Sequence, residues 1–120
     1  MAATRIHHLN FVVRDLAAAC ERFEKRLGIA PFDVVEHAPR GAQIARSRIG
    51  ESWLVLVCPY DADSVPGRYL AKHGEGFFLL SVGSDDVPAD LEFRDGILDW
   101  RVADLGEVCG ALLQLTDDSQ

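Results

Sequence analysis

Residues 6–16 read IHHLNFVVRDL, and residues 77–87, FFLLSVGSDDV, repeat the same order of residue types. In both stretches an alternating apolar segment, typical of a half-buried strand, ends at an Asp placed to cap a helix. A second pair of similar segments, WLVL at 53–56 and LLQL at 112–115, lies near the end of each half. The sequence therefore predicts an internal duplication, which restricts the possible folds more than composition does.

The first half of the chain predicts a βαβββ module over residues 5–58. Residues 5–13 alternate and are rich in Ile, Phe and Val, so we expect a half-buried strand there. Asp15 suits a helix N-cap and Gly28 a helix end, and they enclose an amphipathic segment, 16–27. Three further strands are expected, at 32–37, 42–49 and 52–58.

The second half predicts a shortened copy of this module over residues 76–116. A connector at 59–75, with a short helix from Arg68 to Lys72, precedes it. After the opening strand, the segment 88–93 begins with proline and leaves no room for a full helix, so the copy is shorter by about three helical turns. Its last strands are expected at 97–103 and 109–116.

Composition excludes several classes of function. The chain has 120 residues, enough for one domain with its own core, and a formal net charge of -7 with a pI near 4.9. It has no basic stripe of the kind that binds nucleic acid, and no long apolar segment that would enter a membrane. Its three cysteines are scattered, which favours reduced thiols and a cytoplasmic protein over a disulfide framework.

The tandem modules, with IHHLNFVVRDL at the front and GESWLVLVCP (50–59) closing the first, resemble the vicinal oxygen chelate superfamily. This superfamily includes glyoxalase I, bleomycin-resistance proteins, extradiol dioxygenases and methylmalonyl-CoA epimerase. The connector GRYLAKHGEGFF (67–78) is most similar to that of the epimerase. The resemblance covers residues 5–116 and implies an α+β fold, in which the two βαβββ modules form a cup-shaped mixed sheet. Here the second module lacks most of its helix.

The superfamily binds a divalent metal with one residue from each of four strands that line the cup. The resemblance places these positions at His8, Val55, Leu79 and Gln114. Only His8 and Gln114 carry ligating atoms, whereas catalytic metal sites usually need about three protein ligands. A metal would need a further ligand from His73, from His7 on the opposite strand face or from a second subunit. We therefore expect no cofactor, and a divalent metal at His8 and Gln114 is the alternative.

The resemblance to the epimerase also implies two carboxylates that remove and return a proton. Its two positions are occupied here by Pro39 and Gln114. Neither residue can act as a general base near neutral pH, because proline has no titratable group and an amide does not ionise. The two-base reaction is therefore disfavoured, as is the metal-dependent reaction of glyoxalase I, and whether the chain is an enzyme stays open.

The expected lining of the cup is mostly apolar and aromatic with a few polar groups, which is typical of a small-molecule pocket. The lining residues are His8, Asn10, Trp53, Val55, Val57, Phe77, Leu79, Ser81, Leu112 and Gln114. The alternative is that the same side chains fill a solid core. Among them His8 is the candidate catalytic acid or base, because histidine titrates near neutral pH.

Three functions follow from these observations. The first is a superfamily member with a degenerate metal site that binds a small organic ligand, an acyl thioester or an aromatic compound, as bleomycin-resistance proteins do without catalysis. The second is an epimerase-like isomerase or glyoxalase-like lyase rebuilt around His8 and Gln114. The third is an interaction subunit with a filled cup. The missing helix leaves apolar sheet exposed, which predicts a homodimer.

Overall fold

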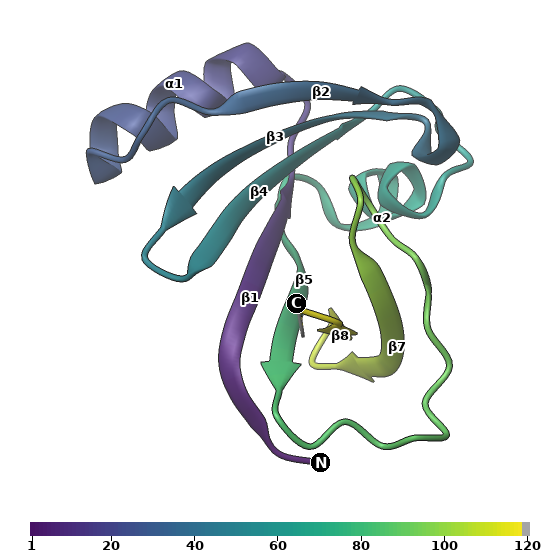
Figure 1. The fold of residues 1–120 in the computed structure, drawn as a ribbon. Coiled ribbons are helices and arrows are strands. Elements are labelled where there is room, and N and C mark those ends of the chain that lie inside the picture. Colours follow the sequence, from purple (N-terminus) through teal and green to yellow (C-terminus); the bar gives the residue numbers. More distant parts are fainter. Residues whose placement is uncertain (119–120) are drawn as a thin grey trace.

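The computed structural model describes residues 1–118 and consists, over that range, of one eight-stranded sheet with two α-helices and a short 3-10 helix (Figure 1). In chain order the elements are β1 (Ala3–Val12), α1 (Leu16–Leu27), β2 (Asp33–His37), η1 (Ala38–Arg40), β3 (Ala42–Ile49), β4 (Ser52–Pro59), α2 (Val65–His73), β5 (Gly76–Ser84), β6 (Arg94–Asp95), β7 (Arg101–Val108) and β8 (Ala111–Thr116).

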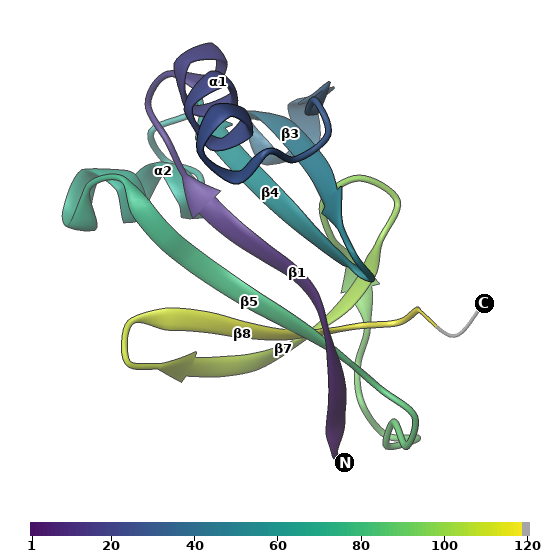
Figure 2. The ribbon, with the colours of Figure 1, turned by 90° about the vertical axis from the view of Figure 1, so that its left-hand side faces the viewer.

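The order of the strands across the sheet confirms the duplication. It runs β2-β3-β4-β1-β5-β8-β7-β6, so β1 with β4, β3 and β2 is matched by β5 with β8, β7 and β6. Within each module the first and last strands pair in parallel, and the two modules join through the antiparallel pair β1 and β5. The sheet bends around this pair into a cup, and Figure 2 shows the strands of the two halves crossing at a wide angle. The predicted α+β fold class is confirmed.

The helix of the first module begins and ends where the sequence predicts. The Asp15 carboxylate accepts a hydrogen bond from the backbone N–H of Ala18 at 3.1 Å, and Gly28 ends the helix with a φ of 63°. Leu16 and Cys20 are buried in a cluster that includes Leu56 of β4, so α1 covers the outer face of the first module. The segment 85–93 forms no helix, which confirms that the second module lacks one.

Two expected boundaries were wrong. The connector helix begins at Val65 rather than Arg68, because the Ser64 hydroxyl caps it by accepting from the N–H of Gly67 at 3.1 Å. The expected strand at 97–103 is replaced by the short β6, a turn, and β7, which starts at Arg101. Leu98 has a φ of 57° in this turn, a left-handed conformation that is incompatible with a continuous strand.

Two β-bulges decide which side chains enter the cup. The register between β1 and β5 shifts at His7, so that His7 and His8 both lie on the cup side, where both rings contact Trp100. The prediction that His7 lies on the opposite face is therefore wrong. A second shift places Phe78 and Leu79 together in the cup, whereas Phe77 packs against Phe11 on the outer face.

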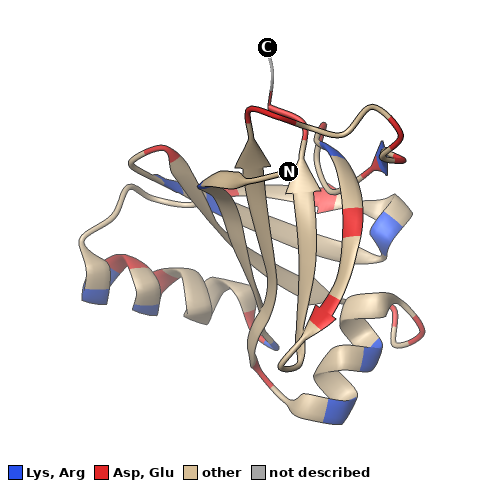
Figure 3. Ribbon diagram, turned by 90° about the horizontal axis from the view of Figure 1, so that it is seen from below, with Lys and Arg blue, Asp and Glu red and all other residues tan. Residues whose placement is uncertain are grey.

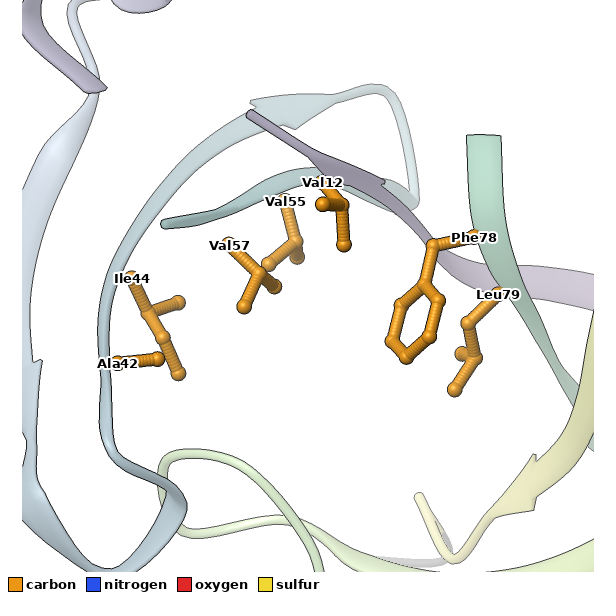
Figure 4. Packing of buried hydrophobic residues seen from close by; sticks show 7 residues of the cluster. All are labelled: Val12, Ala42, Ile44, Val55, Val57, Phe78 and Leu79. Carbon is orange, nitrogen blue, oxygen red and sulfur yellow. The ribbon is translucent and has the colours of Figure 1, made fainter. Parts of the chain in front are cut away.

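The wall of the cup near α2 is a buried apolar cluster. Figure 4 shows its side chains directed from both modules toward the concave side of the sheet; they are Val12, Ala42, Ile44, Val55, Val57, Phe78 and Leu79. Figure 3 shows that charged residues concentrate on the helices, the loops and the outer strands, while the central strands carry few. Within residues 1–118, neither helix has the length and apolar character that crossing a membrane requires.

Candidate functional site

The cup contains an inner cavity of about 240 Å³ that lies between β1, β5 and β8 on one side and the segment 94–97 on the other. Its apolar lining comes mainly from Val57, Phe78, Leu79, Ile97 and Leu112. Its polar lining is Asn10, Arg40, Arg94, Asp104 and Gln114. An apolar cavity with a few converging polar groups is the usual composition of a small-molecule site, and this volume suits a ligand smaller than a typical drug.

Asn10 is the polar group set most deeply in this cavity. It lies in β1 between Val55 of β4 and Leu79 of β5, and only 3 % of its surface is exposed. Its carboxamide makes no hydrogen bond with any residue from 1 to 118, and its Oδ1 is fully buried. A buried amide without a partner is costly, by about 1–3 kcal/mol, so this side chain is ready to bond a ligand.

A hydrogen-bonded group of three side chains lines the same cavity as Asn10. Arg94 donates from Nε and Nη2 to the two carboxylate oxygens of Asp104, each at 2.8 Å, and Gln114 donates to the same carboxylate at 3.4 Å. The Arg94 guanidinium holds the pKa of Asp104 below its ordinary value, and the same contact raises the pKa of Arg94. Asp104 is thus a neutralised anion and a weak base at neutral pH.

Arg40 enters the same cavity from the other module. It is half-buried, lines both the inner cavity and an outer cavity of about 430 Å³, and donates from Nη2 to the backbone oxygen of Asp95 at 2.9 Å. Burial is the main cause that lowers its pKa, and the nearby Arg94 lowers it further. The positions of Arg40 and Arg94 give the cavity two guanidinium groups and one carboxylate.

The opposite end of the cup is filled rather than open. The ring of His8, only 1 % exposed, stacks on Trp100 with a centroid distance of 4.4 Å and an interplanar angle of 24°. Its Nδ1 lies 2.8 Å from Nδ1 of His7, so that one imidazole donates to the other. Burial lowers the pKa of His8 to about 3, with His7 as a smaller cause. His8 is therefore neutral at pH 7 and sealed from solvent.

The predicted lining residues divide between these two ends. Asn10, Leu79, Leu112, Val57 and Gln114 line the inner cavity. The filled end holds His8, Trp53, packed 6.4 Å from Trp100, and Ser81, whose hydroxyl is 2.6 Å from that of Thr116. Val55 is fully buried in the apolar cluster. Phe77 lies outside the cup, which corrects the expected lining, because the bulge in β5 turns Phe78 inward instead.

Several residues of the site were not predicted from the sequence. Arg40, Arg94 and Asp104 supply the charged groups of the inner cavity, and Trp100 covers His8. One signal existed for Arg40, since it directly follows Pro39, the position that aligns with an epimerase carboxylate. Arg94 and Trp100 carried no such signal, because they lie in the segment that replaces the missing helix.

The residues of the cup do not fit the divalent metal that the superfamily resemblance implies. Two of the four ligand positions are the apolar Val55 and Leu79, and His8 is stacked under Trp100 rather than lining the cavity with Gln114. No group of three or more His, Cys, Asp and Glu side chains suited to a metal occurs in residues 1–118.

Comparison with known proteins agrees with this fold. Residues 7–95 match the model of the Glyoxalase/Bleomycin resistance protein/Dioxygenase superfamily. The chain belongs to this superfamily. A search of curated proteins returns no significant match.

Among solved structures of the superfamily fold, the chain is similar to several methylmalonyl-CoA epimerases. It is 29 % identical to the Streptomyces coelicolor enzyme in complex with 2-nitronate-propionyl-CoA, with a TM-score of 0.80, over 96 % of this chain and 97 % of that one. An epimerase in complex with methylmalonyl-CoA and NH4+ is also 29 % identical, with a TM-score of 0.80, over 96 % and 94 % of the two chains. The Mycobacterium tuberculosis epimerase is 21 % identical, with a TM-score of 0.78, over 95 % and 87 %, and shows a similar fold.

Proposed function

We propose that this superfamily member binds a small organic ligand, an acyl thioester or an aromatic compound, in the inner cavity without a metal. The observation that carries the proposal is the unpartnered, buried carboxamide of Asn10 in an otherwise apolar cavity. A core that was simply filled would not leave a polar group unpaired beside open space, because the cost is not recovered there. This favours a binding protein over an interaction subunit with a solid core.

An epimerase-like isomerase is the second candidate, because the epimerase structures are similar over nearly the whole chain. The side chains that line the cavity do not favour an isomerase. Asp104 is the only carboxylate among the described residues that line the cavity, and Arg94 and Gln114 both donate to it. A carboxylate whose pKa is lowered in this way is a poor proton acceptor. We therefore place binding ahead of proton transfer.

Titration of isotopically labelled protein with methylmalonyl-CoA, propionyl-CoA and benzoate tests the proposal. We expect at least one of these probes to shift the side-chain amide signal of Asn10 saturably, with no deuterium entering C2 of methylmalonyl-CoA in D2O. Asn10→Leu should weaken binding about 3- to 10-fold, the effect of one neutral hydrogen bond. Gln43→Leu, a comparable amide-to-leucine change at a β3 side chain that bonds Glu36 and does not line the cavity, should not. Absence of any saturable shift would contradict binding, and rapid deuterium incorporation would favour the isomerase.

A homodimer is the second part of the proposal. Without a second helix, the outer face of β1 and β5 exposes 43 % of Ile6 and 37 % of Phe77, apolar surface of the kind that marks association. We expect a dimer in sedimentation equilibrium at micromolar concentration. Phe77→Asp should shift it toward monomer, whereas Tyr60→Asp, at an exposed aromatic residue after β4, should not. A stable wild-type monomer would refute this arrangement.

A further inference from the structure

We propose that Arg40 binds the anionic group of the cup ligand, so that the ligand is a small organic carboxylate whose apolar part occupies the inner cavity. This inference rests on the proposed binding function and adds the chemical class of the ligand. Arg40 lines the cavity together with Leu79 and Gln114, which stand at two of the metal-ligand positions of the superfamily, but it is not itself at one of these positions.

The charge on Arg40 is not neutralised by the protein. Arg40 forms no ion pair with a carboxylate among residues 1–118, and its described hydrogen bond goes to the backbone oxygen of Asp95. Arg94 and Arg101 differ from it, since they pair with Asp104 and Asp95. Arg46, which is also half-buried, instead lies 4.3 Å over the ring of Trp53. Arg40 is thus a cation at a cavity wall with free hydrogen-bond donors.

The surroundings of Arg40 favour an incoming anion. Asp104, the carboxylate that lines the inner cavity within the described residues, has both oxygens engaged by Arg94, so the Arg40, Arg94 and Asp104 side chains leave one net positive charge there. This local positive charge contrasts with the formal net charge of the whole protein, which is -7. Removing a guanidinium from water is unfavourable unless an opposite charge replaces the lost hydration. A ligand carboxylate would do so and accept two parallel hydrogen bonds.

The backbone holds Arg40 in place before any ligand arrives. Arg40 ends the 3-10 turn after Pro39, and Gly41 follows with a φ of 58° and its N–H bonded to Ala38 at 2.9 Å. A Cβ at Gly41 would lie 2.5 Å from Cβ of Asp61, so only glycine fits this close approach. The carbonyl of Gly41 also accepts from Tyr60 at 2.9 Å. The fixed backbone sets where the Arg40 side chain begins, and the hydrogen bond from Nη2 to Asp95 restrains its guanidinium, so less freedom is lost on binding.

The cavity restricts the remainder of the ligand. Beyond Arg40 the walls are Phe78, Leu79, Ile97 and Leu112, which favour an apolar chain or ring, and Asn10 offers one neutral hydrogen bond. Inorganic phosphate would satisfy Arg40 and leave this apolar surface empty. A short-chain or aromatic carboxylate satisfies both parts of the cavity.

The test compares hexanoate with hexanamide, two probes of nearly equal shape that differ in charge, by calorimetric titration of the full chain. We expect hexanoate to bind at least about tenfold more tightly, the effect of a charged hydrogen bond. Arg40→Gln should remove this preference, while Arg22→Gln, at an exposed arginine of α1, should retain it. Asn10→Leu should weaken both probes alike. Inorganic phosphate should bind more weakly than hexanoate.

The outcomes separate this inference from the proposed function. Equal affinity of the wild-type protein for acid and amide would overturn the role of Arg40 and leave the binding function standing. An undiminished preference for the acid in Arg40→Gln would also overturn it. Failure of both probes to bind, with no shift of the Asn10 signal, would count against both proposals. Because the first comparison uses only the wild-type protein, it does not depend on the variant folding.

Discussion

The protein should lose stability steadily as the pH falls from 7 to 4.5, with His8 as the main cause. In the folded protein burial lowers the pKa of His8 to about 3, and burial also lowers that of His7. In the unfolded chain a histidine titrates near its ordinary value of about 6.5. Between these values the unfolded chain binds a proton that the folded protein excludes, so stability is complete above about pH 6.5 and declines below it.

The expected loss is large compared with the stability of a small domain. Each unit of pKa difference corresponds to about 1.4 kcal/mol, so about 3 kcal/mol is lost by pH 4.5 out of a typical total of about 5–15 kcal/mol. Urea unfolding at pH 7.5, 6.0 and 4.5 measures this directly. His8→Gln, which cannot titrate, should flatten most of the dependence. A wild-type midpoint that stays constant over this range would show that His8 is accessible to protons.

Trp100→Ala should have the second large effect, because it removes the cover from His8. The indole contacts the rings of both His7 and His8. It also packs 6.4 Å from Trp53, and the guanidinium of Arg46 contacts both indoles. Truncating a packed tryptophan costs about 3–5 kcal/mol in full cores, and we expect the lower part of this range since Trp100 is only half-buried. Water would then reach His8, and its pKa should rise toward the ordinary value.

An NMR titration of the His8 ring protons, together with urea unfolding, checks both effects. Trp100→Phe keeps an aromatic face over the imidazole and serves as the matched control, with a smaller loss of stability and a smaller rise in the pKa of His8. If the pKa of His8 in Trp100→Ala equalled that of the wild-type protein, burial by the sheet rather than by Trp100 would be its cause.

The local elements were predictable because their signals lie within a few residues of sequence. The alternation in β1 and the caps of α1 act between neighbours, so Asp15 and Gly28 marked the helix correctly. The duplication was detectable for the same reason, because each module repeats these short-range patterns. Even the absence of the second helix followed from local composition, since proline and a short spacing leave no room for one.

The side chains that enter the cup were only partly predictable. Alternation correctly placed Asn10 and Leu79, but it assumes an unbroken strand and therefore placed His7 and Phe77 on the wrong faces. A bulge is a property of two paired strands, and its position depends on how β1 and β5 share their hydrogen bonds. No pattern within one strand contains this information.

The sequence by itself determined the duplicated modules and the shortened second copy. It also determined that Val55, Leu79 and Pro39 stand at positions where the superfamily resemblance implies metal ligands or a general base. These are properties of single positions or short segments. Only the tertiary structure decided that Trp100 seals His8 and that Arg40 and Arg94, 54 positions apart in the sequence, meet at one cavity. The path of segment 94–100 across the cup brings these groups together, and that path follows from packing against both modules.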